Sequence, residues 1–414
     1  MRIWLIQTGE VLPLSASAKK MRTALLADEL LKRGHDILWW TSAFDHFKKE
    51  WIFDDGAQTE IKKGLRVMAL KGTGYTGNLS LARLLDHRAV AGKFRKFAKN
   101  MPKPDIIIAS LPSHDLAYEA AGFGNDNNVP VIIDIRDPWP DIFLDYVPWP
   151  LKIFARVALF KDFLMAKEAV RTADGLVAVT GSLLNMGLKR AGRTISDKDD
   201  VFYLGYKKSS GRACDRFAAA ADGLHNKFIV FFVGTISRSY HNPLILLDAA
   251  KKISSCSDIH FVIAGDGELF GQLRERAKGL ANVTLTGWLD QDEIEFWLKR
   301  SAIGVCPAAR EADVPTNKMF AYLSAGLPVI SGFRGEMKDI IEKYKAGFYY
   351  EPGDVDALVA SVKRLHDDTG LCKEMSENAG RVFNEMFDAE KIYGAYAEYV
   401  ERAARRHGQK ERMK

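Results

Sequence analysis

The second half of the chain contains two apolar runs that each end in glycine, Phe228-Ile-Val-Phe-Phe-Val-Gly234-Thr235 and Ile259-His-Phe-Val-Ile-Ala-Gly265-Asp266-Gly267. Residues 243–253 between them have the apolar spacing of an amphipathic helix. A strand, a helix and a second strand in this order predict a βαβ unit with parallel strands. Glycine at a strand end lets backbone approach a phosphate, and a following helix offers free N–H groups. We therefore expect an α/β fold with a parallel sheet whose carboxyl edge binds a ligand.

The same alternation extends in both directions and predicts two similar domains joined by the polar segment 207–226. Two such domains imply a cleft between them that holds the ligand. We expect the first domain over residues 1–205, with a C-terminal helix at 385–414 packing back on it, and the second over 206–384. The further predicted strands are 2–7, 36–41, 65–70, 105–110, 131–135 and 175–180 in the first domain, and 283–286, 303–306 and 328–331 in the second.

Composition excludes several classes of protein. Of 414 residues, 47% are hydrophobic and 27% are charged, which is typical of a globular chain and not of a disordered one. No run approaches the ~18 apolar residues of a membrane-spanning helix, and the apolar start at 1–7 is too short for a signal peptide. The four cysteines are widely spaced without a Cys-x-x-Cys pair, so we expect no disulfide framework or zinc site and a cytoplasmic location.

The net charge of +6 is unevenly distributed, because residues 61–103 contain eleven Lys and Arg but a single acid, Asp86. This segment is either a solvated helix face or a surface for an anionic partner such as a membrane leaflet. Nucleic acid is less favoured, since aromatic residues are not interleaved with the charges. Residues 147–171 mix aromatic and basic residues, and we interpret them as a core helix, with a membrane-surface helix as the alternative.

Two segments could bind phosphate. The loop after Gly234 contains Arg238, and an exposed turn with an incidental cation is the alternative explanation. Residues 313–328 predict a turn into a helix that ends at Gly326, with Lys318 in its first turn. A helix N-terminus favours anions, so a cation there makes sense if it faces a phosphate. The glycines at 265 and 267 are equally compatible with a tight turn that contacts no ligand.

The order of these motifs resembles the retaining GT-B glycosyltransferases of family 4, in particular the bacterial transferases of O-antigen, capsule and exopolysaccharide assembly. The resemblance covers residues 1–390, and its motifs are each moderately specific. They are Gly9-Glu10 with Leu12-Pro13, Arg33-Gly34-His35, Asp134-Ile-Arg136-Asp137-Pro-Trp139-Pro140, Gly234-Thr235, Ala264-Gly265-Asp266-Gly267, Asn282-Val-Thr-Leu-Thr-Gly287-Trp288, and Pro315-Thr-Asn-Lys318 with Ala325-Gly-Leu-Pro-Val.

This resemblance implies a nucleotide-sugar donor, UDP-sugar being the first expectation, bound mainly by the second domain. The acid that contacts the donor sugar in the family falls at Asp313, whereas the position of its ribose-binding acid is Ala321. The family's Arg and Lys after the strand-end glycine are also missing, and Arg238 and Lys318 are the available substitutes. The nucleotide-sugar-binding residues expected on this basis are Gly9, Gly234, Thr235, Arg238, Gly265, Asp266, Gly267, Gly287, Trp288, Val314, Pro315, Thr316, Asn317 and Lys318.

The first domain is expected to hold the acceptor, a growing surface polysaccharide or a lipid-linked glycan. Its candidate catalytic residues are Asp137 and His114, and Asp313 of the second domain is a third candidate. A histidine after a strand end is, however, more often structural than catalytic. The family works without a metal, and we expect no metal and no cofactor. The alternatives are an epimerase or phosphorylase of the same fold, or a nucleotide-sugar-binding protein without catalysis. Contact with an anionic membrane is a further expectation.

Overall fold

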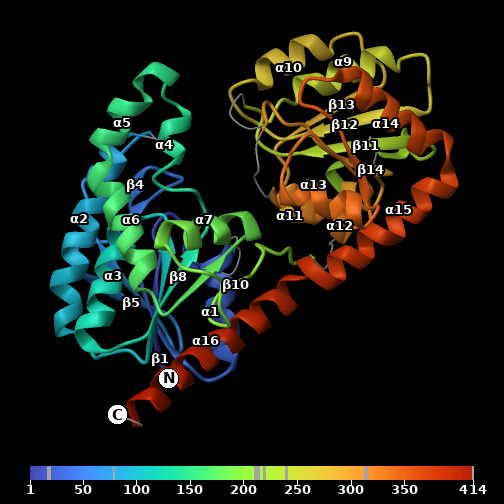
Figure 1. Cartoon of the computed structure of the whole chain (residues 1–414). Coiled ribbons are helices and arrows are strands. Elements are labelled where there is room, and N and C mark those ends of the chain that lie inside the picture. Colours follow the sequence, from blue (N-terminus) through green and yellow to red (C-terminus); the bar gives the residue numbers. More distant parts are fainter. Residues whose placement is uncertain are drawn as a thin grey trace. The chain divides into compact units, whose positions relative to one another are not determined.

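The computed structural model describes residues 1–15, 20–77, 80–208, 215–217, 221–237, 241–311 and 316–412, and the chain divides into two compact units (Figure 1). Unit 1 comprises Met1–Tyr203 and Lys391–Lys414, and unit 2 comprises Leu204–Glu390. The sequence placed the corresponding boundaries after residues 205 and 384. No helix among the described residues combines the length and the apolar character needed to cross a membrane.

Unit 1 is built on an eight-stranded sheet in the order β10-β9-β8-β7-β1-β2-β6-β5, in which only β5 is antiparallel to its neighbour. The predicted strands are all present, and β5, β10 and the small β3–β4 pair are additions. The strands are β1 (Arg2–Ile6), β2 (Asp36–Ser42), β3 (Phe44–Asp45), β4 (Glu50–Trp51), β5 (Ala57–Lys62), β6 (Leu65–Leu70), β7 (Ile106–Leu111), β8 (Val131–Ile135), β9 (Gly175–Ala178) and β10 (Asp200–Val201).

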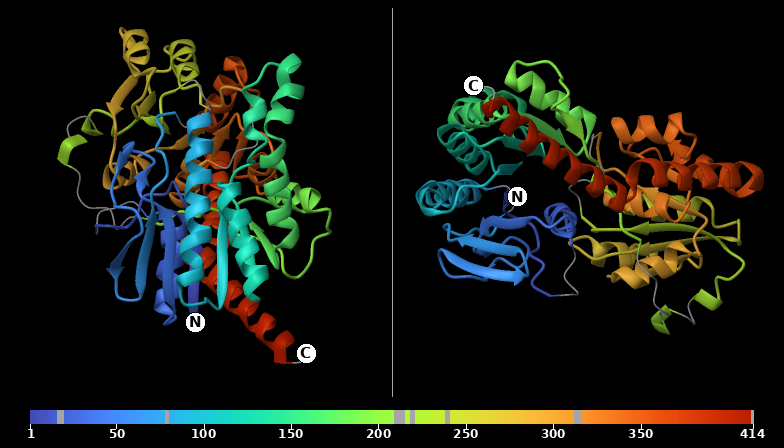
Figure 2. Two further views of the ribbon diagram at one scale, coloured as in Figure 1. Left: turned by 90° about the vertical axis from the view of Figure 1, so that its left-hand side faces the viewer. Right: turned by 90° about the horizontal axis from the view of Figure 1, so that it is seen from below.

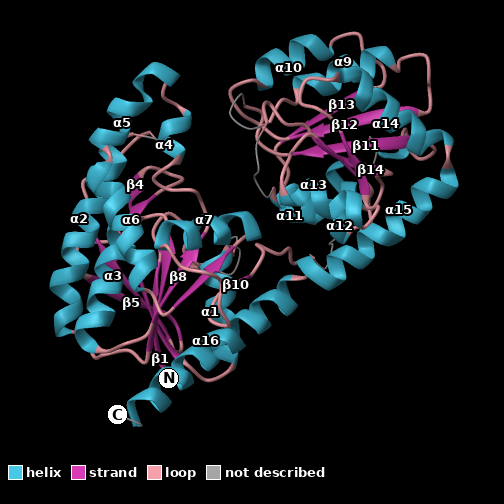
Figure 3. Cartoon of the chain, viewed as in Figure 1, coloured by secondary structure: helices cyan, strands magenta, loops and turns pink. Residues whose placement is uncertain are grey.

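Helices cover both faces of this sheet (Figure 3). On one face, α3 packs between α2 and α6. The helices of unit 1 are α1 (Arg22–Lys32), α2 (Leu81–Phe97), α3 (His114–Asn127), α4 (Ile142–Asp145), α5 (Lys152–Ala158), α6 (Phe160–Thr172), α7 (Gly181–Ala191) and, from Lys391 onward, α16 (Ala389–Arg412).

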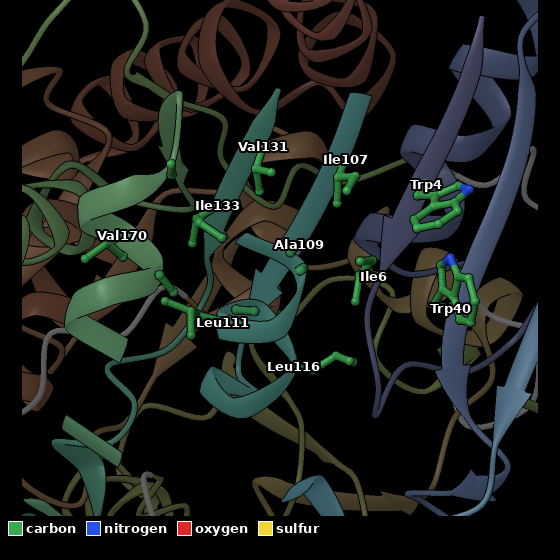
Figure 4. Close-up of a cluster of buried hydrophobic side chains, with 14 of the residues drawn as sticks. Trp4, Ile6, Trp40, Ile107, Ala109, Leu111, Leu116, Val131, Ile133 and Val170 are labelled. Atoms are coloured by element: carbon green, nitrogen blue, oxygen red, sulfur yellow. The ribbon is translucent and has the colours of Figure 1, made fainter. Parts of the chain in front are cut away.

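The core of unit 1 lies between the sheet and these helices (Figure 4). The strands β7 and β8 are buried along their whole length, as expected for central parallel strands covered on both faces. Trp4 of β1 and Trp40 of β2 are buried with ring centroids 5.1 Å apart, and Phe94 of α2 closes the cluster at 4.9 Å from Trp40. Apolar runs at 106–111 and 131–135 therefore become strands because both of their faces are covered.

The C-terminal helix α16 packs on unit 1 (Figure 2). The ring of Tyr396 stacks on Phe202 with centroids 4.5 Å apart and an angle of 7° between planes. At the solvent edge, the His35 Nε2 atom lies 2.8 Å from a carboxylate oxygen of Glu401. The last helix thus binds to the unit that begins the chain.

Unit 2 has a six-stranded, all-parallel sheet in the order β13-β12-β11-β14-β15-β16. Its five predicted strands are present and β16 is an addition. The elements are β11 (Phe228–Val233), α9 (Leu244–Lys252), β12 (Ile259–Ala264), α10 (Phe270–Ala277), β13 (Val283–Gly287), α11 (Gln291–Leu298), β14 (Ile303–Cys306), α12 (Asn317–Ser324), β15 (Val329–Ser331), α13 (Glu336–Lys343), β16 (Gly347–Tyr349), α14 (Val355–Asp367) and α15 (Thr369–Val382).

The interpretation of residues 147–171 as one core helix is wrong for the first half of this segment. The segment divides into a 3-10 turn (Trp149–Leu151), α5 and α6, and none of the residues of α5 is buried. The apolar side chains of Trp149, Phe154 and Val157 are more than two-thirds exposed. These side chains are not needed for packing, because Ala155 and the buried Leu159 make the contacts of this segment with the small apolar cluster around Leu144.

In the part of the chain that the structure describes, five of the eleven basic residues of segment 61–103 pair with acids from other parts of unit 1. Lys62 pairs with Asp28, for example, and Lys93 Nζ lies 2.6 Å from an Asp55 oxygen. Further pairs are Arg66–Asp36, Arg88–Asp162 and Arg95–Glu119. These pairs offset part of the positive excess seen along the sequence.

Candidate functional site

Three glycine-containing loops lie side by side at the carboxyl edge of the sheet in unit 2. Gly234 follows β11, Gly265 follows β12, and Gly287 ends β13. The Gly234 N–H donates to the Ala264 carbonyl at 3.0 Å, and the Gly265 N–H donates to the Gly287 carbonyl at 2.8 Å. The structure therefore brings together the three predicted strand ends, because neighbouring parallel strands end at the same edge.

The close approach of these loops requires glycine. A Cβ atom on Gly265 would lie 1.8 Å from the Gly234 carbonyl oxygen, and one on Gly267 would lie 2.5 Å from the Ile236 carbonyl oxygen. Neither contact is sterically possible without moving the backbone. The glycines thus have a structural role whether or not a ligand is bound, and their N–H groups are already used in part by neighbouring loops.

Among the described residues, Lys318 is a cation that the fold brings to this edge. It lies in the first turn of α12, and a Cβ atom on Gly234 would be 2.8 Å from its Nζ atom. Its Nζ atom lies 2.7 Å from the His241 Nε2 atom and 5.5 Å from the centroid of the Phe232 ring. The sequence pointed to Lys318 by its unusual place in the helix, but it gave no sign of the contact with His241.

Burial lowers the pKa of both members of this pair. It lowers the pKa of Lys318 from its ordinary value to about 8. Burial and the neighbouring ammonium lower the pKa of His241 to about 3, so the imidazole is neutral at pH 7 and accepts a hydrogen bond from Lys318. No carboxylate among the described residues forms an ion pair with Lys318, and Asp313 lies outside those residues. A bound phosphate would offer the Lys318 ammonium a charge-assisted hydrogen bond.

The helix α12 presents its N-terminus at the same place. The N-cap residue, Thr316, is buried and makes no side-chain capping bond, while Asn317 is exposed. Unpaired N–H groups at a helix start bind anions well. Further along α12, Ala321 is 3% exposed, so the helix has a buried methyl group where the resemblance implies a ribose-binding acid.

The remaining predicted residues of unit 2 differ in their situation. Thr235, Asp266 and Trp288 are exposed, and the Asp266 carboxylate accepts the Gly267 N–H at 2.7 Å within its own turn. This hydrogen bond gives Asp266 a structural role in the turn that requires no ligand. The predicted residues Arg238, Asp313, Val314 and Pro315 lie outside the described residues.

In unit 1, Asp137 comes two residues after the end of β8. Its side chain is exposed, yet the protein atoms around its carboxyl raise its pKa against the opposing influence of Arg83 and Arg136. A carboxyl that is accessible and less acidic than usual is suited to proton transfer.

His114, by contrast, has no access to a substrate. Its side chain is fully buried, and its Nε2 atom lies 2.9 Å from an Asp162 oxygen and 3.2 Å from an Asp115 oxygen. The Arg88 guanidinium is 2.8 and 3.0 Å from the two oxygens of Asp162. The expected catalytic role of His114 is thus replaced by a structural one, since it joins the start of α3 to α6.

The same cluster has the donor atoms of a small metal site, because His114, Asp115 and Asp162 each offer a ligand atom within 4.8 Å of the others. Arg88 already neutralises Asp162 through both oxygens. A buried carboxylate that is paired in this way does not need a metal ion to balance its charge. We therefore interpret the cluster as an ionic connection between helices.

Sequence reasoning missed a second polar cluster at the carboxyl edge of unit 1. Arg83 lies over the Trp139 ring at 4.8 Å, and its Nε atom is 3.4 Å from the His87 Nε2 atom. The His46 Nδ1 atom is 2.6 Å from the Tyr75 hydroxyl oxygen. Burial, with Arg83 nearby, lowers the pKa of His46 to about 4 and holds that of His87 well below its usual range.

This cluster belongs to the same edge of the sheet as the loop of Gly9. A Cβ atom on Gly9 would be 3.8 Å from the His46 ring and 3.9 Å from an Arg83 terminal nitrogen. Both histidines are neutral at pH 7, so the positive charge of the cluster comes from Arg83. The residues come from separate loops and from α2, and no sequence spacing reveals that they meet.

Comparisons with known proteins identify the family that the chain resembles and its fold. Residues 227–368, all in unit 2, match the family model described as Glycosyl transferases group 1. The chain is 32% identical over 169 residues to O-antigen chain mannosyltransferase C of Escherichia coli, covering 40% of this chain and 44% of that protein. It is 26% identical over 294 residues to sulfoquinovosyl transferase SQD2 of Arabidopsis thaliana, covering 69% and 54%. The chain thus spans about half the length of the curated relatives it matches.

Solved structures with low sequence identity show the same fold. Sucrose-phosphate synthase of Thermosynechococcus elongatus superimposes with a TM-score of 0.70 at 16% identity, covering 97% of this chain and 98% of that one. HepE of Anabaena in complex with UDP gives 0.66 at 18% identity, covering 97% and 100%. The chain has the GT-B fold, and the resemblance to glycosyltransferases of bacterial polysaccharide synthesis is confirmed.

Proposed function

We propose that this protein is a glycosyltransferase that moves a sugar from a nucleoside-diphosphate donor, UDP-sugar in the first instance, to a glycan acceptor. The donor would bind at the carboxyl edge of unit 2 and the acceptor at the carboxyl edge of unit 1. We further propose that the transfer retains the configuration at the sugar, needs no metal and serves a surface polysaccharide or a lipid-linked glycan. A cytoplasmic site of action is part of the same proposal.

One observation carries the proposal. The ammonium of Lys318 lies against the Gly234 loop at the start of α12, without a carboxylate partner among the described residues. A cation and a helix N-terminus at one strand edge form a site for a diphosphate. This edge belongs to the segment that matches the family model, and HepE, which has the same fold, is solved in complex with UDP.

The proposed step breaks the bond between the sugar C1 atom and the β-phosphate oxygen of the donor, and its electron pair goes to that oxygen. An acceptor hydroxyl oxygen bonds to C1, and its proton passes to the leaving phosphate. Negative charge grows on the diphosphate during this step. Lys318 and the N–H groups at the start of α12 would stabilise this charge most in the transition state.

The acceptor side is assigned to Asp137 and the cluster around Arg83. Asp137 is accessible and has a raised pKa, which suits a group that hydrogen-bonds the acceptor hydroxyl and orients it, while the hydroxyl proton passes to the leaving phosphate. Asp313 would contact the donor sugar, as the resemblance implies. His114 would act only by holding the start of α3.

A nucleotide-sugar-binding protein without catalysis is the second candidate, and Ala321 favours it. A buried methyl group at this place offers no hydrogen bond to a ribose, so the donor would be held more weakly than in the family. The curated relatives described above are named as transferases, which favours transfer over epimerisation.

Incubation with radiolabelled nucleotide sugars tests the proposal. A panel of UDP-sugars, with GDP-mannose as a comparison, should reveal a donor from which UDP is released slowly in the absence of acceptor. Formation of a 2-epimer without release would instead indicate the epimerase, and tight binding without release would indicate the binding protein. Lys318→Met should abolish the release, whereas Lys299→Met, which alters an exposed lysine of the same unit, should preserve it.

A further inference from the structure

An apolar face projects from the helices of unit 1. We define it by the side chains of Trp149, Ile153, Phe154, Val157 and Phe160, each of which is between 60% and 84% exposed. They come from one continuous segment that includes α5, at the upper left of Figure 1. Exposed apolar residues that occur singly need no explanation, but five large ones within twelve residues mark a surface that contacts an apolar partner.

The inward side of this segment is already satisfied. Ala155 and Leu159 pack with Leu144 and with Leu84 of α2, and Trp139 completes this small cluster. The helix is therefore held in place by its small and inward residues, and the apolar face is not a core surface waiting for the rest of unit 1. Its exposure is a property of the folded unit.

Positive charge accompanies the apolar face. Residues 146–161 contain Lys152, Arg156 and Lys161 and no Asp or Glu. Arg156 and Lys161 are exposed, and none of the three has an acidic partner among the residues that the structure describes. The basic residues of α2 differ in this respect, since Lys93, for example, pairs with Asp55. Within residues 146–161, three positive charges thus alternate with the exposed apolar side chains, and the nearest acids along the chain are Asp145 and Asp162.

We propose that the apolar face docks on an anionic phospholipid bilayer. Trp149, Ile153 and Phe154 would enter the boundary between headgroups and acyl chains, where aromatic rings are favoured. Lys152, Arg156 and Lys161 would lie at the level of the lipid phosphates. The inference goes beyond the proposed function, because it depends on neither the donor site nor the acceptor.

Charge also argues against a second copy of the chain as the occupant. Two copies that met through this face would bring six cations together around an apolar contact, and like charges in such a place oppose association. An anionic leaflet attracts the same cations. The apolar side chains alone fit either occupant, and the charges select the bilayer.

Co-sedimentation of the full chain with vesicles tests the proposal. The chain should bind vesicles of phosphatidylcholine with phosphatidylglycerol, and much less to phosphatidylcholine alone. The double variant Trp149→Ser/Phe154→Ser should bind the anionic vesicles at least tenfold more weakly. Lys152→Gln/Arg156→Gln should lose about fivefold per charge, equivalent to ~1 kcal/mol each. Ile195→Ser, which removes an apolar side chain that is 64% exposed elsewhere on unit 1, should bind as the original chain does.

A measurement of UDP affinity and of thermal unfolding accompanies each variant, so that loss of folding is recognised separately. The proposal is overturned if the chain ignores anionic vesicles at low salt, or if the double variant binds as well as the original chain. It is also overturned if sedimentation equilibrium shows a dimer that Trp149→Ser/Phe154→Ser dissociates while vesicles are not bound. Failure of the UDP-sugar assay leaves the docking result intact, because the two measurements have different readouts.

Discussion

Replacement of Lys318 by Met should have opposite effects on donor binding and on stability. The side chain keeps its length and apolar stem but loses the ammonium that lies 2.7 Å from the His241 Nε2 atom. A hydrogen bond to a charged group contributes about 1.5–3 kcal/mol. The affinity for UDP should therefore fall by roughly 10- to 150-fold.

The ligand-free protein should become more stable with this change. Burial lowers the pKa of Lys318 from 10.5 to about 8, which corresponds to a cost of about 3 kcal/mol for keeping the charge buried. The loss of the hydrogen bond to His241 reduces this gain in stability by about 1 kcal/mol. Lys318→Met should thus raise the free energy of unfolding by about 1–2 kcal/mol at pH 7.

The sign of the pH dependence follows from the same pKa. Below pH 8 the lysine is protonated in both the folded and the unfolded chain, so the cost of burial is present in full. Between about pH 8 and pH 10.5 the folded chain has lost this proton while the unfolded chain keeps it, so the stability of the original chain rises with pH. The advantage of Lys318→Met should therefore shrink across this window.

Titration calorimetry with UDP and urea unfolding at several pH values measure both effects. Lys299→Met is the matched control, because that lysine is exposed in the same unit and should alter neither quantity by more than experimental error. A UDP affinity within twofold of the original would refute the assignment of Lys318 to the diphosphate. A loss of stability at pH 7 would refute the view that its charge is held at a cost.

Three further outcomes are expected. Gly265→Ala should abolish UDP binding and destabilise unit 2, because its Cβ would lie 1.8 Å from a neighbouring carbonyl oxygen. The control Gly271→Ala, in open space on a helix, should stabilise the protein by about 0.5–1 kcal/mol, and equal thermal stability of the two variants would contradict the prediction. Arg22→Met should lower the free energy of unfolding in urea by about 3–5 kcal/mol, since it removes one partner of the buried Asp134 carboxylate. Arg171→Met, which breaks an exposed ion pair, should lower it little, and a loss below 1 kcal/mol for Arg22→Met would contradict the prediction. Asp137→Asn should lower turnover by ~100-fold or more and leave UDP affinity unchanged, and turnover within twofold of the original would exclude a catalytic role.

The parallel sheets, the strand-end glycines and the place of Lys318 in the first turn of a helix could be predicted because they depend on local pattern. A strand buried on both faces must be apolar along its length, and a backbone that approaches another backbone must lack a side chain. The runs 228–233 and 259–264 satisfy both conditions in the sequence itself. Neighbouring parallel strands then end at one edge, so the positions of Gly234 and Gly265 next to each other follow directly.

Contacts between distant segments could not be predicted in this way. The meeting of Lys318 with His241, and of Arg83 with Trp139, depends on which loops the fold brings to one edge. The burial of His114 depends on Asp162, which lies 48 residues further along the chain. A sequence shows that these residues are polar but gives no distance between them.

Exposure was decided only by the tertiary structure. The sequence by itself determined that residues 146–161 are apolar, basic and free of acids, and that residues 61–103 are strongly basic. The fold then paired part of the second segment with acids such as Asp28 and Asp55, and it left the apolar side chains of the first in solvent. Periodicity identifies a helix with an apolar side, but the surface that covers this side, whether core or partner, is set by what the rest of the chain packs against it.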